Sequence, residues 1–277
     1  MPGEALIADG LTAGERRTPA ARPGPLPSGR RCSVLGMRVD ELDYERVINQ
    51  IRIWSAEGSS HYMCISTVHM VMESYDDPTF QAVVNAADLV GADGIPVIKV
   101  SGWLGLDRQG RVFAPELLIR LSEVAAAEGI PVGFYGSTPT VIDDLVREVS
   151  TKFPKLNVAY SLSPPFRALS PDELDKVAED INRSGARILF VGLGCPKQEC
   201  WMNRMRGKVN ATMIGVGWAF DVCSGHSKAA PEFIQNAGME WFYRLMLNPR
   251  KLWRRHLRNN PRFLFLIGRQ LVSRSPS

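Results

Sequence analysis

Two short apolar runs that end in glycines constrain the fold of this chain most. Residues 187–194 read Arg-Ile-Leu-Phe-Val-Gly-Leu-Gly, and residues 211–217 read Ala-Thr-Met-Ile-Gly-Val-Gly. A continuous apolar run of this length, bounded by glycines, is typical of a strand that is buried on both faces. Such strands occur in parallel sheets that helices cover on both sides, so the two runs predict an α/β fold.

The segments around these runs alternate between strand and helix patterns. Thr138 and Ser170 stand where they can cap two of the helices. Strands that alternate with helices of about 10–15 residues indicate βαβ units and right-handed crossovers. Residues 32–239 are therefore expected to form one α/β domain, a parallel sheet with helices on both faces. The further predicted strands are residues 61–66, 131–135 and 157–160, and the predicted helices are residues 44–54, 68–74, 79–86, 114–128, 139–153 and 171–184.

The N-terminal residues 1–31 are expected to form a disordered tail. They hold five prolines together with glycines and scattered arginines, a composition that cannot supply a packed core. Arg16, Arg17 and Arg22 precede no apolar run of the about 7–15 residues that a secretory signal contains. With 45% hydrophobic and 22% charged residues, the chain as a whole can bury one sizeable core.

Basic residues are concentrated in a C-terminal segment, residues 240–277, which we call the appendage. From residue 241 on it carries nine of the 33 Lys and Arg residues and none of the 29 Asp and Glu residues, so the first 240 residues hold 24 basic against 29 acidic groups. The basic side chains alternate with leucines and Trp253 as in a basic amphipathic helix, which Pro261 is expected to break before the apolar run 263–267. Such a segment fits an anionic membrane surface or nucleic acid, and the alternative is an ordinary packed helix with a solvated basic face.

Polar side chains cluster where predicted strands end. Because parallel strands gather their carboxyl ends at one edge of a sheet, these residues are expected to share a pocket. Asp93, on a glycine turn, is the natural general base for a substrate hydroxyl, and an Asx-type turn is the alternative. The other clusters are Thr67 with His69, Lys197 with Gln198 and Glu199, and Asp221.

Ordinary structural roles are also open to these residues. Gln198 and Glu199 fit the exposed first turn of a helix as well as they fit a site. Asp221 fits a helix cap, and His69 fits a hydrogen-bonded structural histidine better than a catalyst. Arg111, in a predicted loop, is either a solvated charge or a fork for phosphate.

Several common kinds of site are missing from the sequence. No G-x-G-x-x-G follows a strand and no Walker-type G-x-x-x-x-G-K is present, which argues against a dehydrogenase-like or ATP-binding module. The five cysteines form no C-x-x-C pair and no cluster has metal-ligand spacing, so we expect neither a metal nor another cofactor, and a reducing cytosol fits best. No apolar stretch approaches about 18 residues, so no membrane span is expected. Binding of nucleic acid by the basic appendage would need a recognition helix or an aromatic sheet surface, and neither pattern is found.

Four segments resemble, in order, the motifs of the WecG/TagA/CpsF glycosyltransferases, family 26. The resemblance covers residues 33–268 and implies an inverting enzyme with a Rossmann-like α/β catalytic domain and a helical appendage that closes the active site and touches the membrane. It implies a nucleotide-sugar donor, usually UDP-linked, a polyprenyl-diphosphate-linked acceptor, and a place on the cytoplasmic face of the bacterial plasma membrane. The segments are residues 87–94 (Ala-Asp-Leu-Val-Gly-Ala-Asp-Gly), 192–199 (Gly-Leu-Gly-Cys-Pro-Lys-Gln-Glu), 215–221 (Gly-Val-Gly-Trp-Ala-Phe-Asp), and 240–244 (Glu-Trp-Phe-Tyr-Arg) with 248–251 (Asn-Pro-Arg-Lys).

The resemblance also implies roles for single residues. Asp93 would be the base with Thr67 beside it, and Arg111 and Gln198 would contact substrate, with Asp221 in the nucleotide pocket. His69 and Lys197, at the same sheet edge, complete the expected binding residues of the core. The appendage side chains that match positions thought to reach the diphosphate are Arg244, Lys251 and Arg254.

The function implied is transfer of a hexose or N-acetylhexosamine-type sugar in bacterial exopolysaccharide, surface-polysaccharide or teichoic-acid synthesis. The chain departs from the usual family pattern at four positions, and two of them, His69 and Ala229, bear on which sugar is transferred. His69 stands in place of Asn, Cys195 in place of Ala, Ala229 in place of Arg, and Lys251 in place of Arg.

Overall fold

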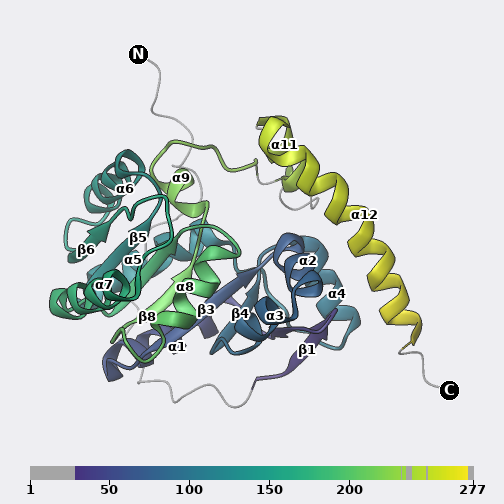
Figure 1. Ribbon diagram of the computed structural model, residues 1–277, viewed down its shortest axis with the longest axis horizontal. Helices are drawn as coiled ribbons and strands as arrows, with labels where there is room; N and C mark the ends of the chain where they lie inside the picture. Colours follow the sequence, from purple (N-terminus) through teal and green to yellow (C-terminus); the bar gives the residue numbers. More distant parts are fainter. Residues whose placement is uncertain (1–28, 232, 235–238, 248, 274–277) are drawn as a thin grey trace, which may run out of the picture.

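A six-stranded sheet forms the centre of the computed structural model, which describes residues 29–231, 233–234, 239–247 and 249–273 (Figure 1). Every neighbouring pair of strands in it runs parallel. The α/β fold that the glycine-ended runs predict is thereby confirmed. From one edge to the other, the strands are β4 (Leu89–Ala92), β3 (His61–Ser66), β8 (Thr212–Gly215), β7 (Ile188–Gly192), β5 (Val132–Gly136) and β6 (Val158–Leu162).

Alternate side chains along each strand supply two hydrophobic cores, one on each face of the sheet. On β7, Leu189 and Val191 belong to one core, whereas Ile188 and Phe190 belong to the other. This period of two is the geometry of a strand that is covered on both sides. The first core is covered by α2 (Val68–Asp76), α3 (Pro78–Asn85), α4 (Ile95–Trp103), α7 (Pro171–Ser184) and α8 (Lys197–Met205), and the second by α1 (Tyr44–Glu57), α5 (Ala114–Glu128), α6 (Pro139–Lys152) and α9 (Ala219–Cys223).

The two helix caps predicted from sequence are confirmed. The Thr138 hydroxyl accepts the Val141 N–H at 3.4 Å at the start of α6. At the start of α7, the Ser170 hydroxyl accepts the Glu173 N–H at 3.2 Å, and the Glu173 carboxylate accepts the Ser170 N–H at 2.8 Å. These bonds satisfy N–H groups that have no partner inside a helix, which is why the helices begin there.

Strands β1 (Arg31–Val34), β2 (Met37–Asp40) and β4 and helix α4 are absent from the sequence-based prediction. Strands β1 and β2 form an antiparallel hairpin, and α4 follows β4 directly. The hairpin turns at Leu35 and Gly36, both with positive φ (51° and 89°). Four-residue strands and a turn without an Asn-Gly pair leave too weak a pattern to recognise. Residues 1–28 of the expected tail lie outside the described residues.

The appendage contains two helices, α11 (Glu240–Leu247) and α12 (Pro249–Ser273), and Figure 1 shows α12 running past α2 at one side of the molecule. The expectation that Pro261 ends the helix is wrong, because α12 continues through it. Phe263 and Ile267, two and six residues after Pro261, are 1% and 3% exposed. The Gln270 amide oxygen accepts the Leu35 N–H of the hairpin at 2.9 Å, and its nitrogen donates to the Ser33 carbonyl at 2.7 Å. This packing outweighs the roughly 3 kcal/mol that a proline costs inside a helix. Among the described helices, none is both long and apolar enough to cross a bilayer.

Candidate functional site

The carboxyl edge of the sheet brings the predicted polar clusters together. Strands β4, β3, β8 and β7 are consecutive neighbours, and each runs into a segment that carries one of the clusters. The Asp93 N–H bonds the Ser66 carbonyl at 3.0 Å, and the Val216 N–H bonds the Val191 carbonyl at 2.9 Å. These main-chain bonds extend the ladder past the strand ends and fix the loops relative to one another. The strand order therefore places the clusters at one edge of the sheet as expected, and their sharing of one substrate pocket stays a prediction.

Asp93 forms an ion pair with Arg111. One Asp93 carboxylate oxygen lies 3.0 Å from Nε and 3.0 Å from Nη2 of Arg111, and the Asp93 carbonyl accepts from Nε at 2.9 Å. The loop is held in place because the next residue, Val112, donates its N–H to the Ala92 carbonyl at 2.8 Å. The guanidinium also stacks over the Phe113 ring, 4.5 Å from its centroid. Of the two roles open to Arg111, a freely solvated charge is excluded.

A second carboxylate reaches the same guanidinium from the appendage. Glu240, the first residue of α11 and the last acidic residue of the chain, pairs with Nη2 of Arg111. Burial works to lower the pKa of Arg111, but Asp93 and Glu240 outweigh it, so the pKa is raised above its usual value. Arg111 is thus a permanent cation between two acids. Sequence reasoning missed Glu240, although its position just before an acid-free segment was a usable signal.

Thr67 and His69 lie at the start of α2, Thr67 as its N-cap and His69 in its first turn. The Thr67 hydroxyl caps α2 by accepting the Met70 N–H at 3.5 Å, which puts Thr67 immediately beside the Asp93–Gly94 turn. Nδ1 of His69 lies 3.5 Å from the Glu73 carboxylate and 3.4 Å from the amide nitrogen of Asn259, a 7% exposed residue of α12. His69 is therefore hydrogen-bonded, and it connects α2 to the appendage.

Gln198 and Glu199 are buried in the first turn of α8, so the exposed alternative for them is wrong. Gln198 is 5% exposed; its oxygen accepts the Gly194 N–H at 3.2 Å and its nitrogen donates to Glu199 at 2.7 Å. A side chain on Gly215 would come within 3.0 Å of the Gln198 amide nitrogen, so this glycine makes room for the amide. The glycines of the β7 and β8 ends thus hold Gln198 in one orientation.

Glu199 is completely buried, and sequence reasoning missed its state. Burial raises the pKa of Glu199 from 4.5 to about 7, while hydrogen bonds from Gln198 and Cys195 work against the rise. Its second carboxylate oxygen has no hydrogen-bond partner among the described residues. The Gln198 amide is thus hydrogen-bonded to a buried carboxyl whose pKa lies near neutral pH.

The other predicted residues make no contact with Asp93 or Arg111 that the described residues show. Lys197 is exposed as the first residue of α8. Asp221 lies in α9, and its carbonyl accepts the Ser227 N–H at 2.8 Å and the Ser224 hydroxyl at 3.3 Å. The side chains of Arg244, Lys251 and Arg254 lie outside the described part of the structure, although their backbone belongs to α11 and α12.

No group of three His, Cys, Asp or Glu side chains that could hold a metal ion occurs within the described residues. The Asp93 cluster instead offers two carboxylates on one permanent cation, and the same sheet edge carries the oriented amide of Gln198. This set is suited to accepting a proton beside an anionic group.

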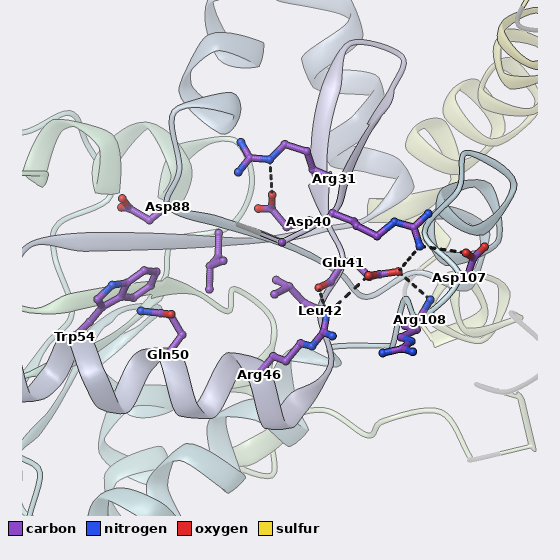
Figure 2. A pocket seen from close by; sticks show the side chains of 13 residues that line it. Arg31, Asp40, Glu41, Leu42, Arg46, Gln50, Trp54, Asp88, Asp107 and Arg108 are labelled. Carbon is purple, nitrogen blue, oxygen red and sulfur yellow. Dashed lines mark hydrogen bonds and ion pairs between the residues drawn. The ribbon is translucent and has the colours of Figure 1, made fainter. Parts of the chain in front are cut away.

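A cavity of about 810 Å³ lies away from this cluster, between the hairpin, α1 and the β4 edge (Figure 2). Charged side chains of both signs line it, but they already hold the structure together. The Asp40 carboxylate accepts the Val90 N–H at 2.8 Å, and the Glu41 carboxylate accepts the Arg108 N–H at 2.9 Å. Figure 2 shows Arg31 and Arg46 directed at these two acids. None of the predicted site residues lines the cavity, so it is not part of the candidate site.

Comparison with known proteins agrees with this arrangement. Residues 32–277 match the model of the glycosyl transferase WecG/TagA/CpsF family. Over 187 residues, which are 67% of this chain and 70% of the relative, the sequence is 35% identical to a Bacillus spizizenii protein named N-acetylglucosaminyldiphosphoundecaprenol N-acetyl-beta-D-mannosaminyltransferase. Both the family and the relative are glycosyltransferases. The chain belongs to the WecG/TagA/CpsF family and is a glycosyltransferase.

Proposed function

We propose that this enzyme transfers a hexose or N-acetylhexosamine-type sugar from a UDP-sugar to a polyprenyl-diphosphate-linked acceptor, with inversion at the anomeric carbon. The relative's name specifies a lipid-linked acceptor of this chemistry, which supports the acceptor class. The observation that carries the proposal is the Asp93–Arg111 pair at the carboxyl edge of the sheet. The pathway is bacterial exopolysaccharide, surface-polysaccharide or teichoic-acid synthesis.

In the proposed reaction, Asp93 accepts the proton of the acceptor hydroxyl while that oxygen attacks the anomeric carbon. The bond from this carbon to the diphosphate oxygen breaks on the opposite face, and UDP leaves with the bonding electron pair. Arg111 stands 3.0 Å from the Asp93 carboxylate and remains charged, so it can bind a substrate anion beside the base. Gln198 is held by two hydrogen bonds and presents a fixed amide to the same edge.

The leaving diphosphate needs more positive charge than one guanidinium. We assign this role to Arg244, Lys251 and Arg254 of the appendage, with no metal. The absence of acidic residues after Glu240 supports the assignment, because nothing in that segment neutralises its cations. Lys197, exposed at the start of α8, and Asp221 are assigned to the nucleotide side of the site.

The test of the base is Asp93→Asn, with Asp107→Asn as the matched control because Asp107 is 74% exposed. Loss of a general base should lower the transfer rate about 10²–10⁴-fold. Binding of UDP, followed by calorimetry, should change little, and the control should behave as wild type. A folded Asp93→Asn enzyme that keeps more than half of the wild-type rate would remove Asp93 from the mechanism. The anomeric configuration of the product, read by NMR, tests inversion.

The proposed membrane contact is made by α12, which has apolar residues on two opposite faces. One face packs on the core through Phe263, Leu266 and Ile267. On the other face Leu257, Leu264 and Phe265 are 64%, 68% and 66% exposed. Leu257 and Leu264 are seven residues, or about two helical turns, apart and Phe265 is next to Leu264, so the three lie on one side of the helix. Arg258 and Arg269 are exposed along its border. A basic, apolar surface of this kind suits the interface of an anionic bilayer.

Binding to phosphatidylglycerol vesicles tests this surface. Leu264→Glu with Phe265→Glu should reduce co-sedimentation more than about tenfold, because each apolar side chain contributes about 1.5–3 kcal/mol when it leaves water. Phe166→Glu is the matched control, since Phe166 is 86% exposed on the loop before α7. Wild-type binding should fall with added salt, as expected for basic residues near anionic lipid. Equal binding by the doubly substituted protein would contradict a membrane role for this face.

A further inference from the structure

The contact between Glu240 and Arg111 links the appendage to the catalytic edge. Nη2 of Arg111 pairs with the carboxylates of both Asp93 and Glu240. The three side chains are only 15–19% exposed, so this is not a solvent-screened surface pair. Ion pairs at such depth depend on good geometry, and Arg supplies it because its planar group offers several donors at once.

Tyr44 and Glu116, which lie near Asp93, are held in place by hydrogen bonds. The Tyr44 hydroxyl of α1 donates to Glu116 of α5 at 2.7 Å and accepts the Phe113 N–H at 3.1 Å. Burial, together with Glu116, raises the pKa of Tyr44 far above its usual value, so its hydroxyl stays neutral. The charged groups that the described contacts place near Asp93 are Arg111, Glu240 through that guanidinium, and Glu116 behind Tyr44. Of these, Glu240 alone belongs to the appendage.

We infer that Glu240 is a positioning residue for sugar transfer: it shares Arg111 with Asp93, so that docking of α11 both orients the guanidinium and preserves the basicity of the catalytic carboxylate. The inference rests on the proposed function, because it takes Asp93 as the base. It adds a regulatory link to that function, since the base reaches its working state only when the appendage is docked.

Electrostatics gives the reason. A carboxylate held by an unshared guanidinium is stabilised as the anion and accepts a proton poorly, whereas a second carboxylate on the same cation offsets part of that field. Without Glu240, the full charge of Arg111 acts on Asp93. The base becomes weaker and Arg111 loses its ion pair with the appendage, so both the rate and its pH dependence should change.

The test compares Glu240→Gln, Glu240→Asp and the control Glu123→Gln, an exposed residue of α5. For Glu240→Gln we expect kcat to fall at least about tenfold, and the acidic limb of the pH–rate profile to move about 0.5–1 pH unit lower. The direction follows because Asp93 stays ionised to lower pH once the negative charge of Glu240 is removed. Glu240→Asp keeps the charge and should restore the position of the limb, and Glu123→Gln should match wild type.

A second readout does not require turnover. Hydrogen exchange of the α11 amides should be faster in Glu240→Gln than in wild type, with the rest of the chain unchanged, because α11 loses its ion pair with the core. A folded Glu240→Gln protein with the wild-type pH–rate profile and unchanged α11 exchange overturns the inference. If the wild-type protein transfers no UDP-sugar, the proposed function fails, and the exchange rates at α11 alone then decide whether Glu240 holds the appendage on the core.

Discussion

The unfolding free energy of Glu199→Gln, measured relative to that of wild type, should be higher at high pH than at low pH. The Glu199 carboxyl is 0% exposed, and burial raises its pKa from 4.5 to about 7. Unfolding returns the group to water, where it loses its proton near pH 4.5. Between these two values the folded state binds more protons than the unfolded state does, so the stability of the wild type falls as pH rises.

The size of this effect follows from the difference between the two pKa values. A difference of about 2.5 units corresponds to about 3 kcal/mol, since each unit is worth about 1.4 kcal/mol. This stabilising contribution is complete below the unfolded value of 4.5 and is lost as pH rises through the folded value of about 7. Glutamine keeps the shape and the oxygen that accepts from Gln198, but it cannot titrate. The stability of Glu199→Gln minus that of wild type should therefore rise by about 3 kcal/mol across this range.

Urea unfolding at several values between about pH 5 and about pH 8, followed by tryptophan fluorescence, measures this difference. The quantity compared is the change of the unfolding free energy with pH. Any pH-independent cost of replacing the unpartnered carboxylate oxygen of Glu199 by an amide nitrogen therefore cancels. Glu123→Gln, on the exposed side of α5, is the control and should run parallel to wild type. If the Glu199→Gln curve also runs parallel to wild type within about 1 kcal/mol, the carboxyl is ionised in the folded protein and our account of its burial is wrong.

Three further outcomes are expected. Gly136→Ala should lower the unfolding free energy, measured by urea titration, by more than about 2 kcal/mol, because φ is +134° and the new Cβ would lie 2.5 Å from the Gly192 backbone. A loss of less than about 0.5 kcal/mol would show that the β5 and β7 ends separate easily. Pro261→Ala should slow hydrogen exchange in α12, since a proline inside a helix costs about 3 kcal/mol relative to alanine, and unchanged exchange would mean that packing alone sets the stability of α12. Sugar transfer should continue in EDTA, since Arg111 and the appendage cations are proposed to stabilise the diphosphate. Loss of transfer in EDTA, with recovery on addition of Mg²⁺ or Mn²⁺, would refute this.

Local patterns were sufficient to predict most of the core. The run at β7 is apolar at every position and that at β8 at every position except Thr212, which indicates strands covered on both faces. The residues just before α6 and α7, Thr138 and Ser170, carry side chains that cap these helices. Such signals are short in range, so they can be read in sequence. The hairpin and the passage of α12 through Pro261 were not predictable, because both depend on contacts between residues far apart, such as Gln270 with Leu35.

For the candidate site, the sequence determined which residues stand at strand ends, and parallel topology alone was enough to predict that Thr67, Asp93 and Gln198 share an edge. Only the tertiary structure decided their states. It pairs Asp93 with Arg111, buries Gln198 and Glu199, and brings Glu240 from the appendage to the same guanidinium. The physical reason is that charge state and orientation depend on burial and on neighbours distant in sequence, whereas the position of a residue at a strand end depends on the chain around it.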